Sequence, residues 1–247
     1  MVLSADPVYA LPETGRDPEM PDFVIAPPPQ PFVPVQGSSA VFPVRRIFCV
    51  GRNYAEHAIE MGSDPTREPP FYFAKPADAL VINGDDMPYP VKTKDLHHEM
   101  ELVVAIGTGG TDIAVGDALK HVWGYCAGLD MTRRDLQGEA KKTGRPWDMG
   151  KGFDQSAPMG ALMPAGNFDP TKGKIQLNVN GQLRQVSDLG KMIWSVAEVI
   201  ANLSSLVRLQ PGDLIMTGTP ENVAAVQKGD LLEGFVEGVG EVKTRIV

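Results

Sequence analysis

Two glutamates separated by one residue stand at the start of the most apolar strand-like run in the sequence. Glu99 and Glu101 come directly before residues 102–107, an apolar, β-branched segment closed by glycine. Because side chains alternate along a strand, residues two apart project to the same face. Two carboxylates held side by side repel each other unless a cation or a shared proton lies between them. The pair is therefore typical of a hard divalent metal site, although an isolated Glu-x-Glu more often stays in solvent before the strand reaches the core.

A third carboxylate and a histidine extend this chemistry. Asp130 follows the strand-like segment 122–129 and suits either a third metal ligand or an ordinary helix start. His57 and Glu60 are three residues apart in a short segment of helical character, which makes them neighbours on one helix face. An imidazole backed by a carboxylate can accept a proton from water near neutral pH. The alternative is an exposed His–Glu pair on a surface helix.

Several other polar side chains are suited to an anionic ligand. Lys75, in the strand-like segment 71–76, is either a surface charge or a buried cation near a ligand. Arg134 and Gln137 are spaced i and i+3 in a helix expected over 132–142. Lys151 is flanked by glycines, which allow a ligand to approach the backbone closely or, alternatively, form a flexible surface loop.

The elements that must position these residues are mostly predicted strands. Strands are expected at 47–50, 71–76, 102–107, 122–129 and 214–217. The alternating run 175–179 followed by Asn180-Gly181 predicts a β-hairpin. An apolar stripe over 193–203 predicts a helix that packs on the core. Asn53 as N-cap and Gly62 as the residue after the C-terminus frame the helix that carries His57, and a proline-punctuated loop suited to a lid follows it.

The composition of the chain, with 43% hydrophobic and 22% charged residues, is ordinary for a soluble globular enzyme or binding protein. Its 247 residues can bury a full core, and its formal charge of −8 argues against nucleic acid or an anionic membrane as a partner. Cys49 and Cys126 lie in apolar runs, which predicts buried free thiols in a reducing compartment. We see neither an apolar run long enough to span a bilayer nor a signal peptide, so a cytoplasmic location is expected.

Proline content divides the chain. Residues 1–36 hold nine of the 22 prolines, which prevents long helices and central strands there. We predict a proline-rich N-terminal extension over 1–36 and a single catalytic domain over 37–247.

Seven motifs occur in a characteristic order and resemble the fumarylacetoacetate hydrolase family. They are G-R-N-Y-A-E-H at 51–57, F-A-K-P at 73–76, H-H-E-M-E-L at 97–102, G-L-D-M-T-R-R-D-L-Q at 128–137, G-K-G-F-D at 150–154, P-G-D-L-I-M-T-G-T-P at 211–220, and closing Gly-Asp hairpins. The resemblance covers about 37–247, and the segment 45–79 is most similar to the branch of bacterial fumarylpyruvate hydrolases. Residues 222–225 depart from the pattern, since relatives carry glycine there.

The resemblance implies an α+β, β-rich fold with a mixed, rolled sheet and short helices, assembled as a homodimer. It implies Mg²⁺ or Mn²⁺ held by Glu99, Glu101 and Asp130, and a general-base pair of His57 and Glu60 on a lid. The remaining expected site residues are Lys151, as a catalytic cation, and four groups around the substrate: Arg134, Gln137, Thr219 and Lys75.

The expected reaction is metal-dependent hydrolysis of a carbon–carbon bond in a 2,4-dioxo acid such as fumarylpyruvate, within a gentisate-type route of aromatic degradation. Water attacks C4, and the leaving pyruvate enolate is stabilised by the metal. Decarboxylation or isomerisation of a related oxo acid uses the same metal but no activated water, so the His57–Glu60 pair favours hydrolysis. A non-catalytic protein that binds a metal or a carboxylate is the remaining alternative.

Overall fold

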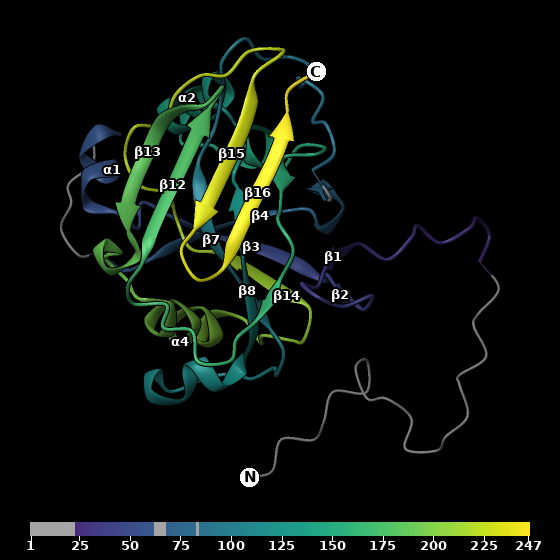
Figure 1. Ribbon diagram of the computed structural model, residues 1–247, viewed down its shortest axis with the longest axis vertical. Coiled ribbons are helices and arrows are strands. Elements are labelled where there is room, and N and C mark those ends of the chain that lie inside the picture. The colour runs from purple at the N-terminus through teal and green to yellow at the C-terminus, as the bar shows by residue number, and fades with distance from the viewer. Residues whose placement is uncertain (1–22, 62–67, 83) are drawn as a thin grey trace.

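The computed structural model describes residues 23–61, 68–82 and 84–247, and its centre is a six-stranded mixed sheet (Figure 1). The strand order is β11-β8-β7-β14-β3-β4. The bounds in that order are Met163–Pro164, Val122–Leu129, Met100–Ile106, Asp213–Met216, Arg46–Gly51 and Phe71–Lys75. β14 and β3 are parallel, and the other neighbours are antiparallel.

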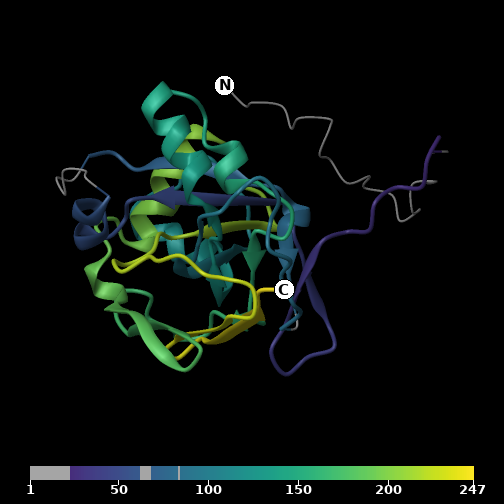
Figure 2. The ribbon, with the colours of Figure 1, turned by 90° about the horizontal axis from the view of Figure 1, so that it is seen from above.

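A second, antiparallel sheet has the order β13-β12-β15-β16 and lies across one face of the first (Figures 1 and 2). Its strands are Gln182–Asp188, Lys174–Val179, Leu231–Val236 and Gly240–Arg245. Alternate residues of β12 and β15 are buried, as expected for a sheet with one face on the core. The β12–β13 turn has positive φ at Asn180 and Gly181, so the predicted hairpin is confirmed.

β7 is buried along its whole length and separates two apolar clusters. Leu102, Val104 and Ile106 belong to the cluster beneath the second sheet, whereas Val103 and Ala105 belong to the cluster on the opposite face. By the same alternation Glu101 projects toward the opposite face, away from the second sheet. The strand alternation thus directs the candidate ligands into a region that the second sheet does not cover.

The helices are short and surround the sheets, and three small strand pairs complete the fold. The α-helices are α1 (Ala55–Glu60), α2 (Arg134–Thr143), α3 (Asp148–Lys151) and α4 (Val196–Leu206), and the 3₁₀ helices are Ala77–Ala79, Val115–His121 and Leu189–Lys191. The pairs are β1 (Phe32–Pro34) with β2 (Val41–Pro43), β5 (Leu80–Val81) with β10 (Ala157–Pro158), and β6 (Leu96–His97) with β9 (Thr132–Arg133). This β-rich α+β architecture confirms the predicted fold class.

The described end of the predicted N-terminal extension packs against the body. Val33 in β1 is fully buried, and Gln36 donates hydrogen bonds to the carbonyl oxygens of Ala161 and Val239. Short edge strands tolerate proline where the missing N–H is not needed, so β1 forms despite the proline-rich composition. Residues 1–22 of the predicted extension lie outside the described residues.

The N-terminus of α1 also differs from the prediction. Tyr54, not Asn53, is the N-cap, and no side chain caps the helix there. The Asn53 amide instead donates to the carbonyl oxygens of Trp194 and Thr217, so it ties the start of α1 to two distant segments. The predicted C-terminal Gly62 and residues 63–67 of the predicted lid loop are outside the described residues.

The predicted buried free thiols at Cys49 and Cys126 are confirmed. Within the part of the chain that the structure describes, no helix is both long enough and apolar enough to cross a membrane.

Candidate active site

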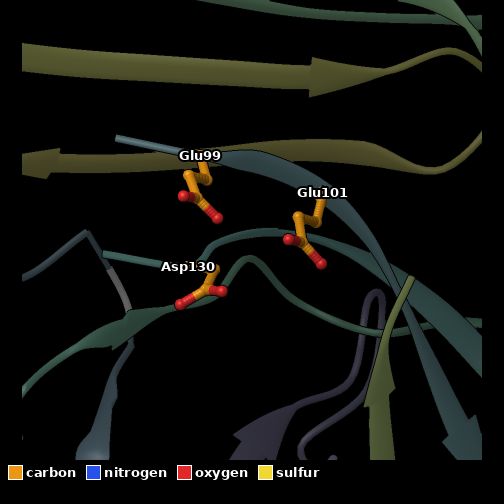
Figure 3. A group of neighbouring side chains, drawn as sticks. All are labelled: Glu99, Glu101 and Asp130. Atoms are coloured by element: carbon orange, nitrogen blue, oxygen red, sulfur yellow. The ribbon is translucent and has the colours of Figure 1, made fainter. Parts of the chain in front are cut away.

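The carboxylates of Glu99, Glu101 and Asp130 meet because of the register between β7 and β8. Met100 pairs with Leu129, and one position farther the Asp130 N–H donates to the Glu99 carbonyl oxygen at 2.8 Å. Glu101 lies two residues along β7 on the same face. One oxygen from each carboxylate lies within 4.8 Å of the others, and Figure 3 shows all three groups turned toward a common space.

The charges at this cluster fit a hard divalent cation. The three side chains are buried, and burial together with the Asp130 and Glu99 carboxylates raises the pKa of Glu101 well above its ordinary value. Glu101 accepts a hydrogen bond from the Gly218 N–H at 2.8 Å but contacts no cation within the described ranges. Asp130 Oδ1 accepts no hydrogen bond of regular geometry there, although Lys75 Nζ is 2.9 Å away. Converging carboxylate oxygens of this kind are the donors that Mg²⁺ and Mn²⁺ prefer.

Lys151 bridges two of the three carboxylates. Its Nζ donates to Glu99 Oε2 at 2.7 Å and to Asp130 Oδ2 at 2.6 Å. Burial lowers the pKa of Lys151, but the Asp130 and Glu99 carboxylates raise it further, so the ammonium form is favoured. Lys151 ends helix α3 and is not in the flexible loop considered as an alternative. A Cβ at Gly150 would lie 2.9 Å from the Gln137 backbone nitrogen, so this glycine serves the approach of α3 to α2.

Lys75, predicted to contact the substrate, is not among the residues that line the cavity described below. Its ammonium is fully buried, 2.9 Å from Asp130 Oδ1, and donates to the carbonyl oxygens of Met131 and Lys151. These contacts direct the ammonium of Lys75 to Asp130 and to the end of α3.

Arg134 and Gln137 form a pair on α2 that extends from Glu99. The Arg134 guanidinium donates to Glu99 Oε1 at 2.5 Å and to Gln137 Oε1 at 2.6 Å. Glu99 therefore contacts two cations. Burial raises the pKa of Glu99, but Lys151, Arg134 and His57 outweigh it, and the net shift is well below the ordinary value.

Thr219 is positioned by a buried glutamine that the sequence did not single out. Gln185 on β13 is fully buried, and its amide nitrogen donates to Thr219 Oγ1 at 3.0 Å and to the Pro220 carbonyl oxygen at 2.9 Å. Its amide oxygen accepts from the Met100 N–H at 3.0 Å. Gln185 thus joins the start of β7, which carries the acidic cluster, to the loop that carries Thr219.

His57 and Glu60 form a side-chain pair on α1, and His57 is buried, not solvated. His57 Nδ1 lies 3.2 Å from Glu60 Oε2, and both Glu60 oxygens accept from the Asn222 N–H at 3.1 Å. Asn222 has φ of 69°, a left-handed conformation that asparagine tolerates better than most residues that have a side chain. Asn222, in the segment 222–225 that departs from the family pattern, therefore adopts a left-handed conformation and anchors α1 through Glu60.

Of the predicted site residues, all but Glu60, Asp130 and Lys75 line one cavity. The lining residues are Val50, Gly51, Arg52, His57, Met61, Phe73, Glu99, Glu101, Arg134, Gln137, Lys141, Trp147, Lys151 and Thr219. Sequence reasoning missed Arg52, Lys141 and Trp147. Lys141 could have been found, because it follows Arg134 and Gln137 at i+7 and i+4, on the same helix face. Arg52 and Trp147 carried no comparable spacing signal.

The comparisons with known proteins agree with this geometry. The profile described as "Fumarylacetoacetate (FAA) hydrolase C-terminal" matches residues 46–247. A fumarylpyruvate hydrolase from Ralstonia sp is 46% identical over 183 residues, which are 74% of this chain and 95% of that protein. The mitochondrial oxaloacetate tautomerase FAHD1 of Rattus norvegicus is 40% identical over 203 residues, 82% of this chain and 91% of the relative.

Among solved structures, the fumarylpyruvate hydrolase of Pseudomonas aeruginosa in complex with Mn²⁺ and pyruvate is 50% identical, with a TM-score of 0.88. The match covers 92% of this chain and 99% of that one. The profile match, the sequence relatives and the shared architecture together establish that the chain belongs to the fumarylacetoacetate hydrolase family.

Proposed function

We propose that this protein is a metal-dependent hydrolase that cleaves the C3–C4 bond of a 2,4-dioxo acid of the fumarylpyruvate type, giving pyruvate and a carboxylic acid. The observation that carries the proposal is the buried His57, which lines the same cavity as Glu99 and Glu101 and is paired through Nδ1 with the more exposed Glu60. The Ralstonia and Pseudomonas relatives, both fumarylpyruvate hydrolases, support this choice of substrate.

Glu99, Glu101 and Asp130 are the residues that would hold the metal. When bound, Mg²⁺ or Mn²⁺ supplies a positive charge that stabilises the negative charge developing on the oxo-acid fragment as the carbon–carbon bond breaks. Lys75 and Lys151 hold the Asp130 carboxylate, and Arg134 and Lys151 hold that of Glu99. The protein therefore fixes the ligand geometry before the ion arrives.

His57 acts as the general base in this proposal. Its Nδ1 proton is donated to Glu60, which leaves Nε2 free to accept a proton from the attacking water. The water oxygen bonds to C4, the C3–C4 bond breaks, and the proton is passed to C3 of the departing pyruvate. Glu60 orients the ring and stabilises the imidazolium, while the Asn222 N–H fixes Glu60.

In this proposal Lys151 and Arg134 supply positive charge near the reacting carbon. Lys151 stabilises the oxyanion that forms at C4, and the Gln137 amide and Thr219 hydroxyl orient the carboxylate end of the substrate. Exclusion of bulk water from a cavity lined by buried groups strengthens each of these interactions.

Tautomerisation of oxaloacetate is the second candidate, because a relative at 40% identity bears that name. That reaction moves a proton at the carbon next to the oxo group and requires no attacking water. Conversion of the enol to the keto form changes the ultraviolet absorbance, and this change measures the rate of tautomerisation directly.

The test is pyruvate release from a panel of acylpyruvates with Mg²⁺ or Mn²⁺, alongside the oxaloacetate assay. We expect fumarylpyruvate to exceed acetylpyruvate in kcat/KM by about tenfold or more, since one paired charge contributes ~1.5–3 kcal/mol. Equal rates would indicate a general acylpyruvate hydrolase. Absence of pyruvate release together with rapid enol–keto conversion would instead establish the tautomerase.

A further inference from the structure

The mouth of the cavity carries two cations that the proposed reaction does not use, Arg52 and Lys141. Arg52 follows strand β3 with φ of 59°, a conformation that is uncommon for a residue with a side chain and that is found at functional sites. The preceding Gly51 is required for close packing, because a Cβ there would lie 2.0 Å from the ring of Phe71. The Arg52 guanidinium lies 5.4 Å from the centre of that ring, so backbone and ring together direct it.

Lys141 reaches the same place from α2. Its Nζ lies 6.0 Å from the centre of the Trp147 ring, and Trp147 contacts Phe71 edge-on with ring centres 5.2 Å apart. Burial lowers the pKa of Lys141, and the charges of Arg52 and Arg134 lower it further. Lys141 therefore lies close enough to both arginines to be repelled by them.

Arg134 is paired with Glu99, but Arg52 and Lys141 form no ion pair within the described ranges. Glu68 and Asp148 line hollows that adjoin Arg52, and neither makes an ion pair with either cation in those ranges. Glu56, the nearest carboxylate on α1 in sequence, lies 3.8 Å from Lys191 instead. Two neighbouring cations that form no ion pair with any described residue, each beside an aromatic ring, are the arrangement expected where an anion binds from solution.

We infer that Arg52 and Lys141 form a second anion subsite, which binds the distal carboxylate of an extended dicarboxylic substrate. The inference rests on the proposed function for the direction of the substrate, whose 2-oxo-carboxylate end lies at the acidic cluster. The distal carboxylate then lies toward the mouth, where both cations line the cavity. The subsite selects for diacids long enough to reach from the metal ligands to the mouth.

Two acids of equal chain length test the subsite without requiring turnover. 2-Oxoheptanedioate and 2-oxoheptanoate share the metal-binding end and differ only in the distal carboxylate. Calorimetry on the full chain with Mn²⁺ is expected to give a Kd about tenfold or more lower for the diacid, the usual effect of one charge-assisted hydrogen bond. Arg52→Gln and Lys141→Gln should each remove most of this preference, while the Kd for 2-oxoheptanoate changes by less than about twofold.

Two further variants serve as controls. Lys142→Gln removes an exposed charge one residue along α2, outside the cavity, and should leave the preference for the diacid unchanged. Arg52→Lys keeps the positive charge and should retain most of the preference, which separates loss of charge from a local folding defect at the strained residue.

Three results would overturn the inference: equal wild-type affinity for the two acids, binding of neither acid, or parallel loss of both affinities in the glutamine variants. Its failure is distinguishable from failure of the proposed function. Pyruvate release without preference for the diacid would contradict the subsite but not the proposed hydrolase activity. Preference for the diacid without pyruvate release from any acylpyruvate would support the subsite and contradict the proposed hydrolase activity.

Discussion

At the scale of single residues, the orientation of His57 is set by two groups on two segments. Glu60 lies 3.2 Å from its Nδ1, and the Asn222 N–H holds Glu60 in turn. The ring therefore has one nitrogen directed to a carboxylate and the other free for proton transfer. This is the arrangement of a base with an orienting partner, built on a helix of only six residues.

Replacing His57 by alanine should lower kcat by roughly 10²–10⁴, the usual contribution of a positioned general base. Glu60→Gln should give a similar or milder loss, and the double variant should be far from additive because the two residues act as a unit. Steady-state pyruvate release measures these effects, and Mn²⁺ affinity by calorimetry should change little. Near wild-type turnover in all three variants would move the base elsewhere in the cavity.

Much of the residue-level site followed from local rules. Alternation along β7 brought Glu99 and Glu101 to one face, and the i, i+3 spacing paired His57 with Glu60. The position of Lys75 did not follow from such rules, because the sequence does not reveal whether a strand-end lysine faces a ligand or a neighbouring carboxylate. Gln185 could not be predicted from local rules either, because its hydrogen-bond partners are 34 or more residues away along the chain.

At the scale of elements, the site depends on how closely α3 approaches α2. α3 has four residues and carries Lys151 at its end, and Gly150 makes its contact with the backbone of Gln137. A sequence pattern of Gly-Lys-Gly predicts permissive backbone but not the partner that requires it. The contact between helices α2 and α3 could therefore not be foreseen from the sequence, whereas the β12–β13 hairpin, fixed by Asn180-Gly181, could.

Gly150→Ala tests this dependence. The new Cβ would meet backbone atoms of α2 at 2.9–3.1 Å, so α3 must shift and Lys151 must move away from Glu99 and Asp130. We expect a loss of stability of about 1–3 kcal/mol, together with a fall in kcat. Gly138→Ala on α2 is the matched control, because nothing lies within 4 Å of its Cβ position. It should be neutral or stabilising by up to about 1 kcal/mol.

Chemical unfolding measures the stability of the two variants, and pyruvate release measures their activity. If Gly150→Ala is as stable and as active as Gly138→Ala, the contact between α2 and α3 does not position Lys151.

At the scale of the whole molecule, the candidate ligands lie in or next to the two longest strands of the central sheet, β7 and β8. Those strands pack against apolar clusters on both faces, so the acidic cluster cannot form in the unfolded chain. Burying three carboxylates carries a cost in the folded state, part of which Lys75, Lys151 and Arg134 offset. A cation that binds only the folded state must therefore stabilise the entire fold.

Thermal unfolding measures this coupling. At a free Mn²⁺ concentration of 100 times Kd the folded state should gain about 2.7 kcal/mol, which for a chain of this size raises Tm by roughly 5–10 °C. Glu101→Gln should abolish the shift. The same variant should be at least as stable as wild type without metal, because burial and the Asp130 and Glu99 carboxylates disfavour the charged form of Glu101, and the amide can still accept from the Gly218 N–H. Glu139→Gln, an exposed carboxylate on α2, should keep the full Mn²⁺ shift. An undiminished shift in Glu101→Gln would mean that the ion binds elsewhere and that the three carboxylates are not its ligands.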